Sequence, residues 1–160
     1  MHPIEYKPIG LIRSPFKQID GMPIQPSAAQ GSQGQIELFP PYEQGLDDLA
    51  GFSHLFLLYH FHRSTGFSLH VKPFLDDQVR GLFSTRAPKR PNPIGLSVVK
   101  LLRIDGNILD IENIDMLDET PLLDIKPFIP EMHAVQEYRI GWMTPHAGKL
   151  MSQKSDERFK

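Results

Sequence analysis

A basic, proline-rich segment is the part of this chain whose residue types point first to binding chemistry. Residues 83–97 read FSTRAPKRPNPIGLS, with Arg86, Lys89 and Arg90 spaced among three prolines. Each proline fixes its own φ and keeps the residue before it out of the helical region, so we predict an extended, irregular loop. Such rigidity lowers the entropic cost of binding a ligand. A stiff connector with solvated charges is the alternative.

Two histidines lie at the end of the most apolar run of the chain, residues 52–62. His60 and His62 are two apart, so on a strand both would point to the same face, as metal ligands sometimes do. No third ligand lies at a recognisable spacing, so we favour a polar group at the end of a buried strand over a metal site. Arg63 adds a cation at that end.

Polar residues in two further loops are weaker candidates when they are taken alone. Gln25, Pro26 and Ser27 present an amide, a fixed turn and a hydroxyl within a long irregular stretch, which suits an exposed loop. Asp118 and Thr120 stand just before a proline, which suits a simple turn.

Short strands are the elements that must position these residues. Apolar runs bounded by turn signals predict strands at residues 4–12, 34–39, 52–62, 79–85, 96–104, 108–114 and 122–127, and a short helix at 42–49. Asp105-Gly106-Asn107 predicts the turn of a hairpin. The pattern is typical of a mainly β domain, and a small closed barrel of six to seven strands with short peripheral helices would leave no exposed edge. The chain contains neither a G-x-G-x-x-G loop nor a P-loop.

Composition limits the class of protein. The 160 residues suit one domain, which we expect to span 1–150 and to be followed by a flexible polar tail at 151–160. The chain has no cysteine, signal peptide or membrane-spanning run, so we expect a cytoplasmic protein without disulfides or thiolate chemistry. The net charge of −2 argues against indiscriminate nucleic-acid binding, whereas four cations within residues 80–90 favour one anion-rich partner.

Several long motifs resemble one known family, the TrmO-type or TsaA-like tRNA methyltransferases. The segments that carry the likeness are TR at 85–86, RPNPIGLS at 90–97, DETPLLDIKP at 118–127, IGLIRSP at 9–15 and FSHL at 52–55. The motifs are long enough to make chance agreement improbable.

The resemblance implies a compact β-barrel, a homodimer and S-adenosylmethionine as methyl donor. It also implies methylation of N6 of N6-threonylcarbamoyladenosine, beside the anticodon of tRNA. By motif, the cofactor would be held by Gln25, Pro26, Ser27, His62, Arg63, Arg86, Leu96, Asp118, Glu119, Thr120 and Pro121. Leu96 would contact the adenine, Asp118 the positive centre, and an arginine the carboxylate.

Methyl transfer by in-line displacement depends on holding the reacting atoms in place, and the proton on the acceptor nitrogen must leave. For that proton, Asp118 is our first choice of base and His62 our second. We expect contacts to tRNA, chiefly to its phosphates, from Lys89, Arg90, Asn92 and Lys126.

Glu119 departs from the family, in which glycine is common at this position. Glutamate adds a charge and removes ready access to positive φ, so either the turn differs or glycine was never required there. We also expect the chain to lack the C-terminal extension of longer relatives. Two alternatives stay open: the same donor with another RNA or a small-molecule acceptor, and a non-catalytic nucleotide- or RNA-binding barrel.

Overall fold

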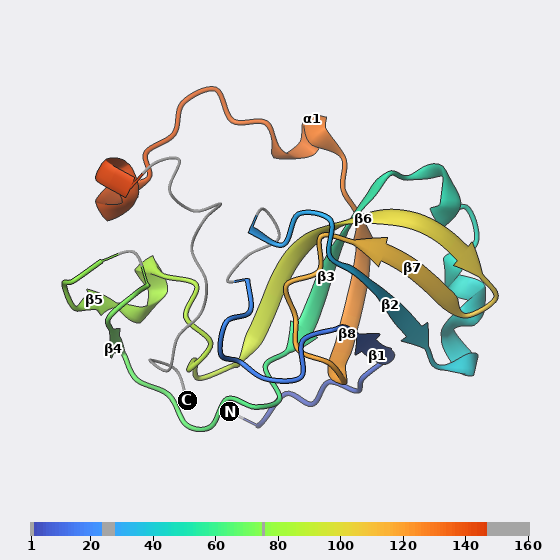
Figure 1. Ribbon diagram of the computed structural model, residues 1–160, viewed down its shortest axis with the longest axis horizontal. Helices are drawn as coiled ribbons and strands as arrows, with labels where there is room; N and C mark the ends of the chain where they lie inside the picture. Colours follow the sequence, from blue (N-terminus) through green and yellow to red (C-terminus); the bar gives the residue numbers. More distant parts are fainter. Residues whose placement is uncertain (1, 24–27, 75, 147–160) are drawn as a thin grey trace.

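Six antiparallel strands close into a barrel in the computed structural model, which describes residues 2–23, 28–74 and 76–146 (Figure 1). Their order around the barrel is β1-β2-β7-β6-β3-β8, and β8 pairs with β1 to complete the ring. Their bounds are Gly10–Arg13 (β1), Gln33–Leu38 (β2), His54–His60 (β3), Ile94–Asp105 (β6), Ile108–Glu112 (β7) and Thr120–Pro127 (β8). Because every barrel strand has two neighbours, no edge of this sheet is exposed. The prediction of a small, mainly β barrel is confirmed.

Alternation along the strands builds the core of the barrel. β3 reads HLFLLYH, and Leu55, Leu57 and Tyr59 are buried while the residues between them are only partly buried. The other apolar side chains of this core with no exposed surface are Ile12, Ile36, Val99, Leu109, Ile111, Ile114 and Leu122. Strict alternation is what allows each strand to face the core with one side and the surroundings with the other.

Three of the predicted elements differ from the structure. β1 begins at Gly10 instead of residue 4, since Pro8 has no N–H to donate to a ladder and residues 2–8 are exposed. The predicted strand at 79–85 is reduced to Arg80–Gly81 (β5), which pairs with His70–Val71 (β4). The chain then turns into a 3-10 helix, Leu82–Ser84 (η4), where Thr85 N donates to Leu82 O at 3.0 Å. The helix predicted at 42–49 is a 3-10 helix at Pro40–Leu46 (η2).

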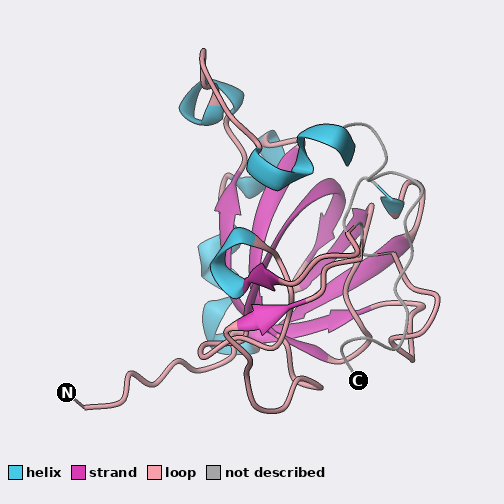
Figure 2. Cartoon of the chain, turned by 90° about the vertical axis from the view of Figure 1, so that its left-hand side faces the viewer, coloured by secondary structure: helices cyan, strands magenta, loops and turns pink. Residues whose placement is uncertain are grey.

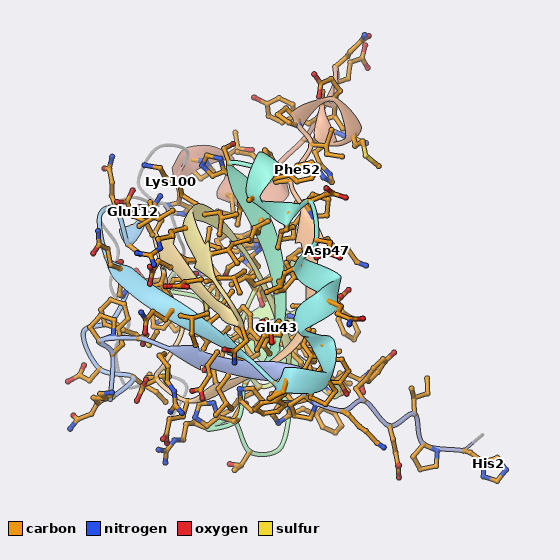
Figure 3. The ribbon with its side chains drawn as sticks, turned by 90° about the vertical axis from the view of Figure 1, so that its right-hand side faces the viewer. His2, Glu43, Asp47, Phe52, Lys100 and Glu112 are labelled. Atoms are coloured by element: carbon orange, nitrogen blue, oxygen red, sulfur yellow. The ribbon has the colours of Figure 1, made fainter. Side chains whose placement is uncertain are left out.

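The two ends of the barrel differ. At one end, η2 and a second 3-10 helix, Leu49–Gly51 (η3), lie across the opening, and Leu46 and Leu49 pack against the core. Figure 3 views this end and labels Glu43 of η2 and Asp47, the residue that follows it. The other end carries β4, β5 and η4 and faces the viewer in Figure 2, which also shows the N-terminal residues leaving the barrel as an extended arm. The core is thus covered by η2 and η3 at the first end, and the loops of the second end include the proline-rich segment.

The C-terminal part of the described chain returns to this second end. A short helix, Pro130–His133 (α1), follows β8, and a 3-10 helix, Gly141–His146 (η5), ends the described chain. Residues 131–140, from within α1 to the start of η5, are all exposed. Trp142 Nε1 donates to Ser84 O at 2.9 Å, and the Arg80 guanidinium lies 5.5 Å from the centre of the Trp142 ring. These contacts fasten the segment to η4 and β5. The predicted tail at 151–160 lies outside the described residues, and no helix in the described part of the chain is long and apolar enough to cross a membrane.

Candidate active site

A cavity of about 730 Å³ lies at the end of the barrel that carries β4 and β5. Three buried residues of its wall are Tyr59 of β3, Ser97 of β6 and Thr120 of β8, each at or near the end of its strand and at most 5% exposed. Residues of the proline-rich loop, of η4 and of η5 form the walls. Clefts of about 300–1,000 Å³ are typical of small-molecule sites.

The proline-rich loop is extended, as predicted, and its own side chains hold it in shape. The Arg90 guanidinium donates to the carbonyls of Thr85 and Ala87 at 3.0 and 3.4 Å and lies 5.7 Å from the centre of the Phe83 ring. Arg86, in contrast, is exposed and lines the cavity. Both arginines of the motif line the cavity, but they differ: the Arg90 guanidinium is engaged by the backbone of the loop, whereas Arg86 is exposed.

Gly95, the glycine of the RPNPIG segment, is required by the ring of Tyr59. The two residues pair across β3 and β6, and a Cβ on Gly95 would stand 2.2 Å from Tyr59 Cε2. The phenol therefore lies flat over the backbone of β6, and its hydroxyl reaches Ser97 two residues further on.

A buried chain of three polar side chains runs beneath the cavity. Tyr59 Oη lies 3.0 Å from Ser97 Oγ, and Ser97 Oγ donates to Asp115 Oδ1 at 2.8 Å. Asp115 follows β7 and is only 9% exposed, and its burial raises its pKa to about 7, although the bond from Ser97 acts in the opposite direction. Burial, with the nearby Asp115 carboxyl, also raises the pKa of the Tyr59 phenol well above its ordinary value. None of these three residues was predicted to belong to the site.

His62 lines the cavity, but His60 does not. β3 ends at His60, and the chain turns so that His62 N donates to the His60 carbonyl at 2.8 Å, so the prediction that both side chains share one strand face is wrong. His62 Nδ1 lies 3.3 Å from Thr120 Oγ1. Partial burial, with the charge of Arg63, lowers the pKa of His62, so the ring is neutral at pH 7. No group of three or more metal-ligating side chains occurs among the residues described.

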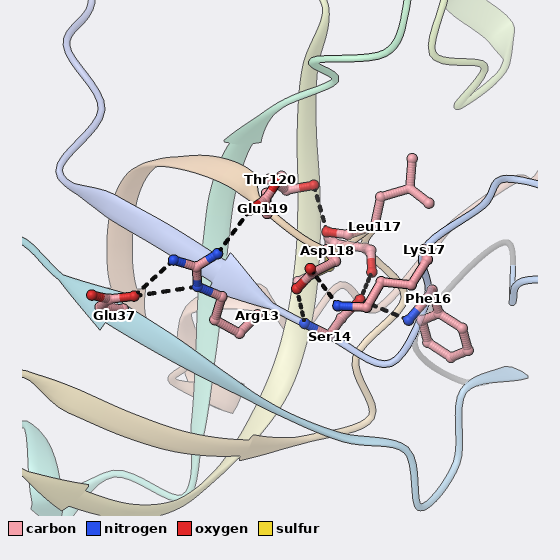
Figure 4. Close-up of polar contacts among 10 residues, drawn as sticks. Arg13, Ser14, Phe16, Lys17, Glu37, Leu117, Asp118, Glu119 and Thr120 are labelled. Atoms are coloured by element: carbon pink, nitrogen blue, oxygen red, sulfur yellow. Dashed lines mark hydrogen bonds and ion pairs between the residues drawn. The ribbon is translucent and has the colours of Figure 1, made fainter.

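Asp118 is not among the residues that line the cavity, although Leu117 and Thr120 on either side of it are. Figure 4 shows its polar contacts. Its carboxylate accepts a bond from Ser14 N at 3.0 Å and pairs with Lys17 Nζ. Burial alone would raise the pKa of Asp118. Lys17 and the backbone N–H groups lower it by more than burial raises it, so the net pKa lies below its ordinary value. Asp118 is thus ionised at neutral pH, and it ties the segment after β1 to the turn before β8.

Glu119 occupies the conformation for which glycine is usually chosen. Its φ is 61°, so the turn has the left-handed geometry even without glycine, and the expectation that glutamate removes access to positive φ is wrong. The Glu119 carboxylate lies 3.2 Å from Arg13 Nη1, and Arg13 also pairs with Glu37 at 3.1 Å (Figure 4). The strain of the turn is therefore accompanied by an ion pair that glycine could not make.

The remaining predicted residues divide by location. Those on the cavity wall are His62, Arg63, Arg86, Arg90, Leu96 and Thr120. Those that do not line it are Lys89, Asn92, Asp118, Glu119, Pro121 and Lys126. Lys126 is exposed on β8 and pairs with Asp124 at 2.8 Å. The predicted residues Gln25, Pro26 and Ser27 lie outside the described residues.

Comparison with known proteins gives consistent matches. Residues 11–134 match the family described as tRNA-methyltransferase O N-terminal domain. A probable S-adenosyl-L-methionine-binding protein of Pyrococcus abyssi is 50% identical over 154 residues, which are 96% of this chain and 84% of the relative. The tRNA (adenine(37)-N6)-methyltransferase of Escherichia coli is 39% identical over 81% of this chain and 60% of its own length. The crystal structure of TrmO from Pseudomonas aeruginosa has a TM-score of 0.74 at 38% identity, over 88% of this chain and 63% of that one. This chain thus spans less than two thirds of the last two proteins.

Proposed function

The chain belongs to the tRNA-methyltransferase O N-terminal domain family, and we propose on this basis that it binds S-adenosylmethionine and methylates N6 of an adenine in tRNA. The observation that carries the proposal is the cavity at the barrel end, because the motif residues His62, Arg86, Leu96 and Thr120 all line it. For the acceptor we propose N6-threonylcarbamoyladenosine next to the anticodon, which follows from the motifs.

The residues on the cavity wall fit this cofactor. Arg86 offers a guanidinium for a carboxylate, Leu96 an apolar surface for an adenine, and Thr120 a hydroxyl for a polar edge. Arg63 adds a second cation at the rim, while Asp118, Glu119 and Pro121 support Thr120 from outside the cavity. The cofactor would supply an electrophilic methyl group on a sulfonium.

The protein contributes by positioning and by excluding water. The proline-rich loop is braced by Arg90 before any ligand arrives, so Arg86 needs little reordering to bind. η5 adds Trp142 and Met143 to the wall of the cavity. His62 is neutral at pH 7, so it can accept a hydrogen bond or a proton there, whereas the low pKa of Asp118 makes it a weak base.

Partners and location follow from the substrate. We propose that Lys89, Arg90, Asn92 and Lys126 lie along the path of tRNA and that the protein works in the cytoplasm, where tRNA is used. We also propose a homodimer, because the exposed stretch at 131–140 carries large apolar side chains that a second copy would cover. Light scattering on the purified protein should give twice the chain mass, and a monomer at micromolar concentration would contradict this part.

Binding of S-adenosylmethionine, measured by calorimetry, tests the proposal first. We expect saturable binding by the wild type, and a loss of affinity of about tenfold or more for Arg86→Ala, because a charge-assisted contact is removed. Arg103→Ala is the matched control, since Arg103 pairs with Asp105 at the other end of β6.

Transfer of labelled methyl to tRNA then tests the reaction. Transfer to tRNA with N6-threonylcarbamoyladenosine but not to unmodified tRNA is the expected result. Binding of the cofactor with no transfer to either tRNA would favour another acceptor. Absence of both binding and transfer would favour the non-catalytic barrel and overturn the proposal.

A further inference from the structure

The buried chain of Tyr59, Ser97 and Asp115 has no part in the function proposed so far, although all three residues line the cavity. Tyr59 and Ser97 lie at the ends of β3 and β6, and Asp115 follows β7, so three different segments converge here. Three polar side chains that are each at most 9% exposed are costly to bury without a purpose in the fold or the reaction.

In this hydrogen-bonded series of three side chains, each hydroxyl donates its proton in the direction of Asp115. Ser97 has one hydroxyl proton and donates it to Asp115 Oδ1, so Tyr59 must donate its own proton to Ser97 Oγ. Such an order stabilises an ionised carboxylate at a buried position. Yet no cation in the described part of the chain forms an ion pair with Asp115, and the charge that acts on it is that of Arg86, which lines the same cavity.

We infer that Asp115 accepts the proton that the acceptor nitrogen loses during methyl transfer, an inference that rests on the proposed function. As the nitrogen forms its bond to the methyl carbon, the N–H proton moves to the Asp115 carboxylate, and the electrons of the broken carbon–sulfur bond stay on sulfur. Asp115 becomes a neutral acid and returns the proton to water after the product leaves. Ser97 and Tyr59 are positioning residues that hold the carboxylate in place at the cavity wall.

Asp115 suits this task better than the two residues predicted for it. A general base works best when its pKa lies near the operating pH, and that of Asp115 is about 7. Asp118 has a lowered pKa and does not line the cavity. His62 lines the cavity, but its pKa is lowered and its Nδ1 is engaged near Thr120. The groups that face Asp115 are Tyr59, Ser97 and Arg86.

The decisive measurement is the single-turnover rate of methyl transfer against pH for Asp115→Asn, with S-adenosylmethionine and tRNA carrying N6-threonylcarbamoyladenosine. We expect the wild-type rate to rise with pH up to a plateau, with a midpoint at or below about 7 because the sulfonium charge lowers the pKa of Asp115. The variant should still bind the cofactor, though more weakly, because the carboxylate no longer attracts the sulfonium. At saturating cofactor it should react about 100-fold or more slowly and lose that rise. Asp110→Asn is the control, since Asp110 bonds to Gln35 away from the cavity and should change nothing.

Two further readouts keep the inference testable if Asp115→Asn fails to fold. Carbon-13 NMR of the free wild-type protein should show one aspartate carboxyl with a pKa near 7. This signal should be absent from Asp115→Asn if that variant folds. In Ser97→Ala, the pKa of this carboxyl should be higher than in the wild type. In Ser97→Ala the rise in rate should also move to higher pH, because a bond that stabilises the ionised form is lost. An Asp115 pKa near 4, or a wild-type rate profile in Asp115→Asn, overturns the inference. Absence of transfer by the wild type overturns the proposed function and this inference together, whereas a normal wild type with an unaffected variant overturns only this inference.

Discussion

At Glu119 a side chain is held in a backbone conformation that costs free energy. Its φ of 61° disfavours any residue with a Cβ by about 1 kcal/mol relative to glycine. Its ion pair with Arg13 is exposed, and such pairs contribute about 0–1 kcal/mol. The two effects are therefore of similar size and opposite sign.

We predict that Glu119→Gly leaves the free energy of unfolding within about 1 kcal/mol of the wild type, because the strain and the ion pair are lost together. Glu119→Ala keeps the strain and loses the ion pair, so it should be less stable than Glu119→Gly by about 1 kcal/mol. Urea unfolding of the three proteins measures both differences. Equal stability of the glycine and alanine variants would show that the turn relaxes without strain.

Asp115 should leave a signature in the pH dependence of stability. The ordinary pKa of an aspartate is 3.8 and that of Asp115 in the folded protein is about 7, so between these values the folded state binds more protons than the unfolded state. Stability from this group therefore falls as pH rises through that window, by about 2 kcal/mol between pH 5.5 and pH 7.5. The lowered pKa of His62 has the opposite effect, but it is common to both proteins compared below.

We predict that Asp115→Asn gains stability relative to the wild type as pH rises from 5.5 to 7.5, because the variant has no carboxylate to desolvate. Chemical denaturation at a series of pH values gives the difference directly, and Asp110→Asn serves as the control with no such trend. A difference that does not vary with pH would mean that Asp115 titrates at its ordinary value.

Among the elements, the pairing of β3 with β6 depends on one missing side chain. A Cβ at Gly95 would stand 2.2 Å from the Tyr59 ring, and the ring cannot retreat without leaving Ser97. We predict that Gly95→Ala lowers the free energy of unfolding by about 1–3 kcal/mol and weakens cofactor binding. Gly81→Ala is the control, because its added Cβ would meet nothing within 4 Å and its φ is −62°. Normal stability and binding in Gly95→Ala would show that Tyr59 can move freely.

The sequence predicted the barrel strands because alternation and turn signals are local. Leu55, Leu57 and Tyr59 alternate with less buried residues in one continuous run, and Asp105-Gly106-Asn107 gave the hairpin between β6 and β7. The strand predicted at residues 79–85 was too long, because an apolar run does not reveal how long its partner strand is. Here the partner, β4, has only two residues to pair with. The proline-rich loop was predictable, since proline restricts the backbone whatever surrounds it.

At the scale of the whole molecule, tRNA must approach from the cavity end, so cations there should carry the salt dependence of binding. We predict that Lys89→Ala, in the proline-rich loop at the cavity end, reduces the slope of log affinity against log salt by about 1. Lys126 pairs with Phe56 near the far end of β8, away from the cavity, so Lys126→Ala should change the slope less. Lys100→Ala is the control, since Lys100 pairs with Glu112 and both residues are seen when the barrel is viewed from the end opposite the cavity (Figure 3). Arg90→Ala is a poor test, because its guanidinium braces the loop. An unchanged slope in Lys89→Ala would remove this lysine from the tRNA path.

The site was only partly predictable because its geometry joins residues that are far apart in the chain. Asp118 was a sound choice by residue type, but its pairing with Lys17 depends on β1 lying beside β8. Asp115 was missed, although an acid directly after a strand with alternating apolar residues is a signal that could have found it. Its importance depends on which end of the barrel is open, and that is decided by η2 and η3 covering the other end.

The position of Trp142 has a practical consequence for optical spectroscopy. It is the one tryptophan of the chain, and it lies on the cavity wall with its indole N–H bonded to Ser84 O. Its fluorescence therefore reports on the cavity from a single known place, with no label and no contribution from a second indole. A ligand that enters the cavity should shift or quench this emission, so binding and release can be followed in a stopped-flow instrument on the unmodified protein.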